Sequence, residues 1–251
     1  MAKNTDLTVP GPAAIVPYSV DAVRLQEILE ETLTPGEQLT PQLLPTIKIP
    51  AAGGRNWELP DGSAVPALSG VVLYRQTPRA YWLNAFGEGG GNNAPDCWSA
   101  DGVAGNGYYD GQHFDAEDGN VLNPGGKCFT CPQSVWGSSG KGNSQACRQL
   151  TRLFLMFEDS VLPTVLVLPP SSYQVCQQYA VAAVNRGGLT RVVTTVGLEK
   201  DKNPDGIEYS RATFHVAASL DAAAQARIQA YRAAIVPHLK AMAAAPVTEE
   251  V

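Results

Sequence analysis

The fold of this chain is decided by residues 150–168, which read LTRLFLMFEDSVLPTVLVL. Two apolar runs, 150–157 and 164–168, lie on either side of the polar turn 158–160, and each has the length of a strand. The stretch therefore predicts two consecutive β-strands, the second of which is stopped by two prolines.

A helix and two further strands are predicted after these two. The helix begins at a serine after Pro170 and ends at the glycine pair 187–188. Its expected apolar face consists of Tyr173, Cys176, Tyr179, Ala180 and Ala183. The runs 189–198 and 208–217 surround the turn-forming segment 201–206, so they predict a β-hairpin.

Two strands, 68–74 and 79–86, are predicted before the cysteine-rich part of the chain. From residue 79 onward the order is strand, cysteine-rich insert, strand, strand, helix, strand, strand. Five strands with a helix between the third and the fourth is the order of an OB-fold. The sequence thus predicts a mainly β (α+β) protein with a five-stranded OB-fold-like barrel, and a zinc-binding insert, 96–148, between strands 1 and 2. An α+β sandwich would give the same order of elements.

Both ends of the chain are expected to be arms around an OB-like domain that spans residues 51–218. Residues 1–50 hold one helix signal, with Ser19 as its N-cap, followed by four prolines. Residues 219–251 hold an Ala-rich helix interrupted near Pro237, then a short acidic end, Glu249–Glu250.

The composition limits the class of protein. With 251 residues, 44% of them hydrophobic and 17% charged, the chain can bury a full core and is too apolar for general disorder. Its apolar runs are too short to span a membrane, and its first residues contain no apolar signal segment, so a cytoplasmic protein is expected. A net charge of −6 argues, taken alone, against a nucleic-acid partner.

Four of the five cysteines gather in a region rich in Gly, Asn, Ser and Asp. They are Cys97, Cys128, Cys131 and Cys147. Such a region has few apolar residues to bury, and a tetrahedral metal is the simplest way to order it. The four thiols, two of them in a C-x-x-C pair, therefore predict a Zn²⁺ site.

Alternatives remain for these cysteines. The C-x-x-C pair could be a redox pair, although the βαβ setting of thioredoxin-like pairs is missing. His113 could replace one cysteine as a ligand, but its acidic surroundings are more typical of a solvated loop histidine. Cys176 falls on the apolar face of the predicted helix and is expected to be a buried thiol.

Charge and aromatic residues suggest a nucleic-acid surface near the cysteines. No acidic residue occurs between Asp118 and Glu158 or between Asp159 and Glu199, whereas basic residues do. The side chains expected to meet phosphates are Lys141, Arg148, Arg152 and Arg191. Those expected to stack on bases are Trp136, Phe129 and one of Tyr81 and Trp82. Aromatic residues that alternate along strands more often belong to a core.

No enzyme is predicted. The chain has three histidines and no convincing acid–base or nucleophile cluster. The glycine-rich run 137–142 departs from the phosphate-loop pattern at its first glycine and at its Ser/Thr position.

Several stretches together resemble a family carried by bacteriophages and mobile elements of bacteria. They are DCWSADG (96–102), GGKCFTCPQSVWGSSGKGNSQAC (125–147), RLFLMF, LPPSSYQ and VVTTVGLEK. The chain is similar in plan, over about residues 71–217, to the zinc-containing single-stranded DNA-binding proteins of tailed phages, whose OB-fold carries a zinc lobe. Where those proteins use a histidine ligand, this chain has a fourth cysteine.

The resemblance implies a protein without catalytic activity that coats single-stranded DNA during replication or recombination. The acidic end is similar to tails that recruit replication proteins. A zinc-stabilised protein-interaction or regulatory factor, without nucleic-acid binding, is the alternative.

Overall fold

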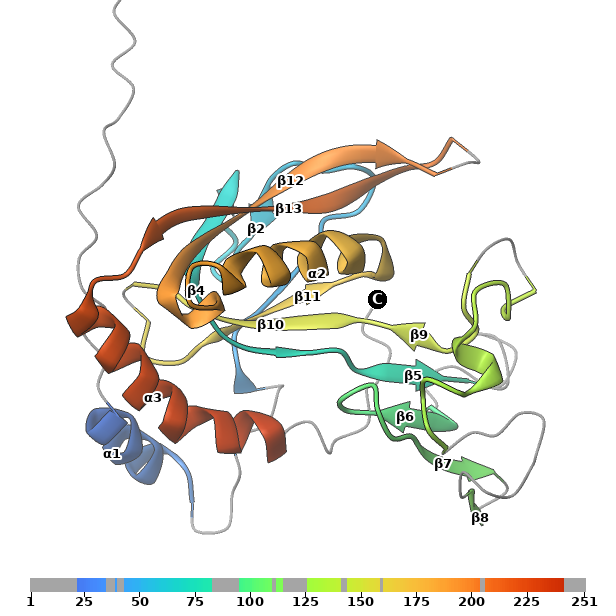
Figure 1. Cartoon of the computed structure of the whole chain (residues 1–251), viewed down its shortest axis with the longest axis horizontal. Helices are drawn as coiled ribbons and strands as arrows, with labels where there is room; N and C mark the ends of the chain where they lie inside the picture. The colour runs from blue at the N-terminus through green and yellow to red at the C-terminus, as the bar shows by residue number, and fades with distance from the viewer. Residues whose placement is uncertain are drawn as a thin grey trace, which may run out of the picture.

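The computed structural model describes residues 22–34, 39, 43–82, 95–109, 112–114, 126–140, 144–158, 160–203 and 206–241. Within these residues the protein has a mixed α/β architecture, in which strands predominate and a few helices pack around a large sheet (Figure 1). None of the described helices is long and apolar enough to cross a bilayer.

The large sheet has six strands. In spatial order they are β1 (Thr46–Lys48), β11 (Thr164–Leu168), β10 (Thr151–Met156), β4 (Ala67–Gln76), β12 (Val192–Lys202) and β13 (Glu208–Ser219). The pair β1–β11 is parallel and the other pairs are antiparallel. The strands predicted at 150–157 and 164–168 are confirmed as β10 and β11, and the predicted hairpin is confirmed as β12–β13.

A second sheet of five strands lies beside the end of the first (Figure 1). Its order is β8 (Gln112–Phe114), β7 (Asn106–Tyr109), β6 (Cys97–Ser99), β5 (Arg79–Tyr81) and β9 (Arg148–Gln149). A small pair is formed by β2 (Trp57–Glu58) and β3 (Ala64–Val65). The helices are α1 (Ala22–Thr32), α2 (Pro170–Val184) and α3 (Ala222–Ala241), with short 3₁₀ turns η2 (Pro132–Ser134) and η3 (Leu189–Arg191).

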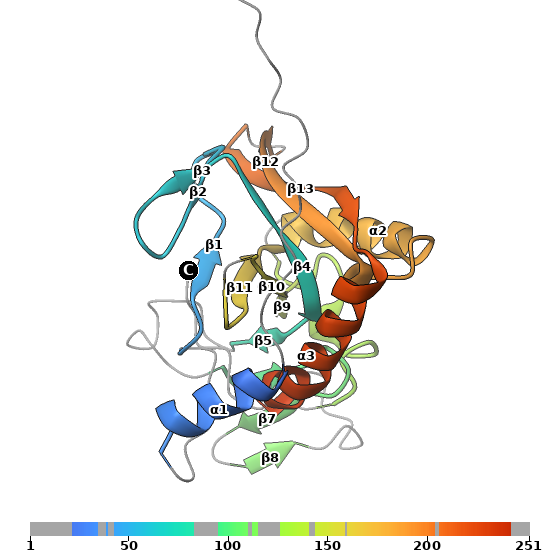
Figure 2. The same cartoon turned by 90° about the vertical axis from the view of Figure 1, so that its left-hand side faces the viewer.

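The large sheet is buried on both faces. Along β10, Phe154 and Met156 belong to a core with α1 and α3, whereas Leu153 and Leu155 belong to a core with α2 and β2. Alternate residues of a strand point to opposite faces, so a strand that is apolar at every position needs cover on both sides. Figure 2 shows α1 beside α3 at one side of this sheet.

The expectation of a closed barrel is wrong for the described residues, which form an open sheet. A small barrel has one inner core, and the outward side chains of its strands are largely polar. Here both side-chain sets of the central strands are apolar, so the chain covers each face with helices instead.

The ends of the chain are not separate arms where the structure describes them. Ile47 lies in β1, which pairs with β11, and Leu25 of α1 is buried in the core. At the other end, α3 continues through Pro237 and buries Ile228 and Leu239. The prolines before residue 50 break helices and strands into short pieces, but they do not prevent the apolar residues between them from joining the core.

Helix α2 begins without the predicted serine cap. Pro169 is the N-cap residue, and Ser172 lies inside the helix, fully buried. The Ser172 hydroxyl instead accepts a hydrogen bond of 3.1 Å from the backbone N–H of Ala212 in β13. This bond fixes the start of α2 against the edge strand of the sheet.

Candidate functional site

The four cysteines of the predicted metal site lie in one lobe, which is a continuation of the large sheet. Strand β4 runs through Thr77 and Pro78 into β5, and β9 runs through Leu150 into β10. The N–H of Leu150 donates to the carbonyl of Pro78 at 3.0 Å, which bridges the two sheets. We call the described residues from 79 to 149 the cysteine lobe.

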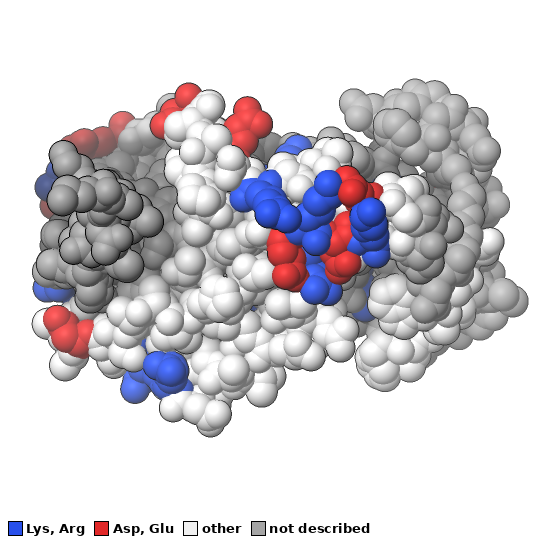
Figure 3. Space-filling model, turned by 90° about the horizontal axis from the view of Figure 1, so that it is seen from above, with Lys and Arg blue, Asp and Glu red and all other residues white. Residues whose placement is uncertain are grey.

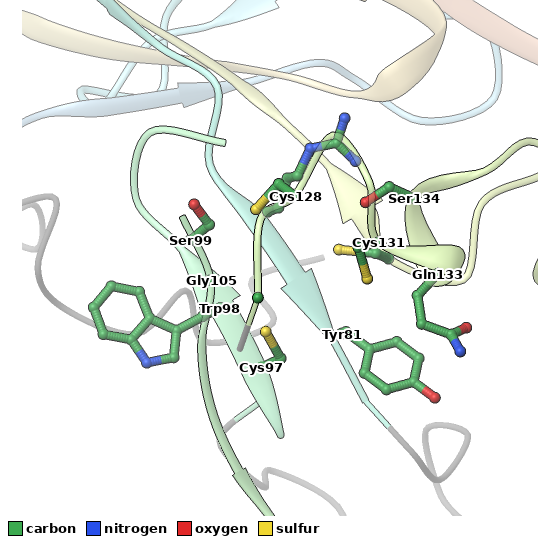
Figure 4. A pocket seen from close by; sticks show the side chains of 12 residues that line it. Tyr81, Cys97, Trp98, Ser99, Gly105, Cys128, Cys131, Gln133 and Ser134 are labelled. Atoms are coloured by element: carbon green, nitrogen blue, oxygen red, sulfur yellow. The ribbon is translucent and has the colours of Figure 1, made fainter. Parts of the chain in front are cut away.

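All four cysteines line a single pocket in this lobe (Figure 4). Cys97 opens β6, Cys128 and Cys131 lie in the turn before η2, and Cys147 directly precedes β9. Cys128 and Cys147 are buried, while Cys97 and Cys131 are partly exposed. The pocket therefore brings together thiols that lie up to 50 positions apart in the sequence.

Backbone hydrogen bonds hold the cysteine-bearing segments together. The N–H of Cys128 donates to the carbonyl of Val103 at 2.9 Å, which ties the C-x-x-C turn to the segment after β6. The N–H of Cys147 donates to the carbonyl of Gln133 in η2 at 2.8 Å. These bonds satisfy backbone groups that the short strands of the lobe leave unpaired.

The turn after β6 is fixed by Asp101, which the sequence analysis did not single out. Its Oδ1 atom accepts hydrogen bonds from the N–H of Val103 at 2.8 Å and from the Ser99 hydroxyl at 3.1 Å. Although desolvation acts in the opposite direction, these bonds hold the pKa of the Asp101 carboxyl below its usual value. The run Ser-Ala-Asp-Gly, a common turn composition, was the available signal.

Cys128 and Cys147 are not activated as redox-active thiols are. Burial is the main influence on Cys128 and Cys147, and it raises the pKa of Cys128 and raises that of Cys147 to about 11. The positive charge of Arg79 opposes this effect for both thiols. Redox-active cysteines have a lowered pKa, because the thiolate is the reactive form. The burial of these thiols therefore favours a structural role over redox exchange.

The pocket suits a soft metal by the chemistry of its donors. Four thiols on one pocket are the donor set that Zn²⁺ prefers in structural sites. As the side chains stand, no three His, Cys, Asp or Glu of the described residues surround a common point closely enough to hold an ion. Binding would therefore need the sulfur atoms of the four cysteines to come closer together. The side chain of His113, the alternative ligand, lies outside the described residues.

Two aromatic side chains of the lobe point into solvent. Phe129, within the C-x-x-C turn, is 76% exposed, and Trp136, two residues after the end of η2, is 61% exposed. Tyr81 is instead buried and lines the cysteine pocket, which removes it from the set that could stack on bases. Trp82 is half-buried, with the guanidinium of Arg148 5.9 Å from its ring centre.

The predicted basic residues are distributed over different parts of the molecule. Arg148 is exposed in the lobe, beside Trp82. Arg152 lies half-buried in β10, between Gln76 of β4 and Val167 of β11, and so belongs to the large sheet. Arg191 is exposed in η3, outside the lobe, and Lys141 lies outside the described residues. The lobe thus contains Arg148, Trp82, Phe129 and Trp136, with Arg148 beside Trp82, and it does not contain Arg152 or Arg191.

The largest cluster of charge in Figure 3 is a mixed one on the β12–β13 hairpin. Arg211 contacts Glu199 at 2.7 Å and Asp201 at 3.1 Å, while Lys200 pairs with Glu208. Because positive and negative side chains alternate and pair there, this surface offers no excess positive charge to phosphates.

Gly102 is expected to be essential for joining the lobe to the large sheet. It has a φ of +76°, and a Cβ atom there would lie 2.7 Å from the backbone carbonyl oxygen of Thr77. Gly102→Ala should lower the stability of the lobe by more than the roughly 1–2 kcal/mol that a left-handed alanine costs. Gly137→Ala is the matched control, since Gly137 has a φ of +90° and nothing near its Cβ position. Limited proteolysis and chemical denaturation compare the two, and equal losses would contradict the expectation.

Comparisons of the chain with protein-family models, with curated proteins and with solved structures give no match.

Proposed function

We propose that the protein binds single-stranded DNA without sequence preference, through the exposed aromatic and basic side chains of a zinc-ordered cysteine lobe. The observation that carries this proposal is the pair of exposed rings, Phe129 and Trp136, on either side of η2, next to the cysteine pocket. Its setting would be replication or recombination of a phage or mobile element, as the resemblance in sequence implies.

Among the residues that the structure describes, little covers the two rings. Trp136 is followed by the run Gly137–Gly140, which presents backbone and two serines but no apolar side chain. Large exposed aromatic side chains are costly to hydrate, and they are typical of surfaces that meet a partner. Base faces are apolar and planar, and their stacking on aromatic rings is largely independent of sequence.

Arg148 supports the proposal as an exposed basic side chain of the same lobe, where it lies beside the ring of Trp82. An arginine that lies over an indole keeps its N–H donors at the edge of the guanidinium plane, where they can meet phosphate oxygens. Arg148 is exposed and starts β9, directly after the pocket residue Cys147. The lobe therefore combines a stacking surface with a phosphate donor.

The order of elements also agrees with this proposal. The strand predicted from residue 79, taken as the first of the five, is β5 and belongs to the second sheet. With β4 in its place, β4, β10, β11, α2, β12 and β13 follow the order strand, strand, strand, helix, strand, strand. The cysteine lobe is inserted between the first two of these strands, and in OB-folds that loop contributes to the binding of oligonucleotides. We propose an opened, OB-related sheet with the lobe as its zinc-bearing loop.

Trp136→Ala tests the stacking surface. We expect affinity for fluorescently labelled oligo-dT to fall by roughly one to two orders of magnitude, because base stacking contributes about 1–3 kcal/mol per base. The melting temperature should hardly change, since the ring is mostly in solvent. Ile207→Ala, which removes a similarly exposed apolar side chain from the hairpin turn, should bind like the wild type. A large fall in melting temperature for Trp136→Ala would instead place this ring in a core.

A protein partner is the second candidate. Val103 and Val135 are also exposed in the lobe, so Phe129 and Trp136 lie in a partly apolar surface. The salt dependence of binding separates the two functions. Binding of a single strand weakens with salt, with a slope of roughly −0.7 per phosphate neutralised, and an apolar protein contact needs no such slope.

A further inference from the structure

We propose that Arg79 is the charge partner of the metal site, a positioning residue whose guanidinium stabilises the metal-bound thiolates. The inference rests on the proposed function, in which the four cysteines bind Zn²⁺. It follows from where Arg79 lies, from which of its N–H groups already have partners, and from the charge that four thiolates would bring into the pocket.

Arg79 is held in place from one side. It opens β5, lines the cysteine pocket, and faces Gln149 on the neighbouring strand β9. Its Nη2 atom donates a hydrogen bond to Oε1 of Gln149, which is itself buried. This bond fixes the plane of the guanidinium at the wall of the pocket.

The other side of the guanidinium faces the cysteines, and the interaction of Arg79 with the Cys147 thiol opposes the rise that burial causes in the pKa of that thiol. The Nη1 atom of Arg79 is buried and has no hydrogen-bond partner among the residues that the structure describes. The hydroxyl of Ser134, also at the pocket, is buried and without a partner in the same set of residues. Buried donors are rarely left without an acceptor, because each such group costs free energy. Two of them at one pocket indicate an acceptor that arrives with a ligand.

Metal-bound thiolates are acceptors of the required kind. A Zn²⁺ ion with four thiolates has a net charge of −2, and a partly buried site with this charge needs positive charge and donors around it. In the described part of the chain, no ion pair links Arg79 to a carboxylate that would cancel its charge. Arginine suits the task because its planar fork can donate to Gln149 and to a sulfur at the same time.

Zinc affinity of the full-length protein tests the role of Arg79. Affinity would be measured by competition with a chromophoric chelator for the wild type, Arg79→Met and Arg79→Lys. We expect Arg79→Met to bind zinc about 10- to 100-fold more weakly, the range found when outer-shell partners of a metal are lost. Arg79→Lys should recover part of the loss because it restores the charge. Arg186→Met removes an exposed arginine outside the lobe and should leave zinc affinity unchanged.

Cobalt spectra separate this role from a purely structural one. With saturating Co²⁺, Arg79→Met should keep the thiolate-to-cobalt bands of the wild type, because the four ligands remain. If Arg79→Met does not fold, Gln149→Met provides the test. This variant keeps the positive charge of Arg79 but removes the hydrogen-bond acceptor that fixes the guanidinium, and we expect zinc affinity to fall about tenfold.

The outcomes distinguish the two proposals. Zinc affinity equal to that of the wild type in Arg79→Met, or in Gln149→Met where the first variant does not fold, would overturn the role of Arg79 alone. A wild-type protein that takes up neither Zn²⁺ nor Co²⁺ through its thiols would overturn the metal site, and the role of Arg79 with it.

Discussion

Cys128→Ser is expected to abolish zinc binding and to leave the cysteine lobe open to protease. The lobe has short strands and few buried apolar side chains of its own, such as Ala80 and Tyr81. A structural zinc site contributes binding free energies of about 10–16 kcal/mol in small zinc domains at neutral pH, and that energy is folding energy. The loss should therefore be local unfolding of the lobe, while the large sheet persists.

Metal content and proteolysis measure this effect together. The wild type should contain one zinc per chain, and Cys128→Ser none, with new cleavage sites between β5 and β9. Cys176→Ser is the matched control, because Cys176 is a buried cysteine of α2 outside the pocket. This control should keep its zinc even if it loses stability. A metal-free wild type with a protease-resistant lobe would show that the cysteines order the lobe without an ion.

Trp57→Ala should produce the largest loss of global stability of any single substitution considered for the large sheet, about 3–5 kcal/mol. Trp57 is completely buried, in the core between the sheet and α2. Its Nε1 atom donates a hydrogen bond of 3.0 Å to the carbonyl of Val196 in β12. Truncation would leave a cavity and a buried carbonyl without its donor.

Urea denaturation followed by circular dichroism would measure the effect of Trp57→Ala. Trp57→Phe is the control that keeps most of the volume and removes only the hydrogen bond, so a smaller loss is expected. If the alanine variant lost less than about 1 kcal/mol, Trp57 would not pack as the structure places it.

The strands of the large sheet could be predicted because the apolar residues that form each strand are consecutive in the sequence. The runs at β10 and β11 are continuous, and the turn between them is polar, so both strands follow from the sequence alone. The same continuity is typical of a strand that is covered on both faces, and the prediction of a barrel did not take account of it. A run of residues also does not show what covers a strand. One cover, α2, directly follows β11, whereas α1, α3 and the β2–β3 pair are distant in sequence.

The site was only partly predictable for the same reason. The four cysteines could be grouped by type and spacing, and the structure places all of them on one pocket. Arg79 and Gln149 could not be found, since their meeting depends on the pairing of β5 with β9, 70 positions apart. The alternation of side chains along one strand also could not show which of Tyr81 and Trp82 faces inward, because this depends on which face of the strand the rest of the protein covers.

At the junction between the two sheets, the cysteine lobe is an insertion between the two strands of a hairpin. The chain leaves the large sheet after Gln76 and returns to it at Thr151, and Gln76 is directly paired with the next residue, Arg152. Without the lobe, β4 and β10 would be the two strands of an ordinary antiparallel hairpin, with the same register toward β11 and β12. A change in the length or composition of the lobe should therefore leave the pairing of the strands of the large sheet unchanged.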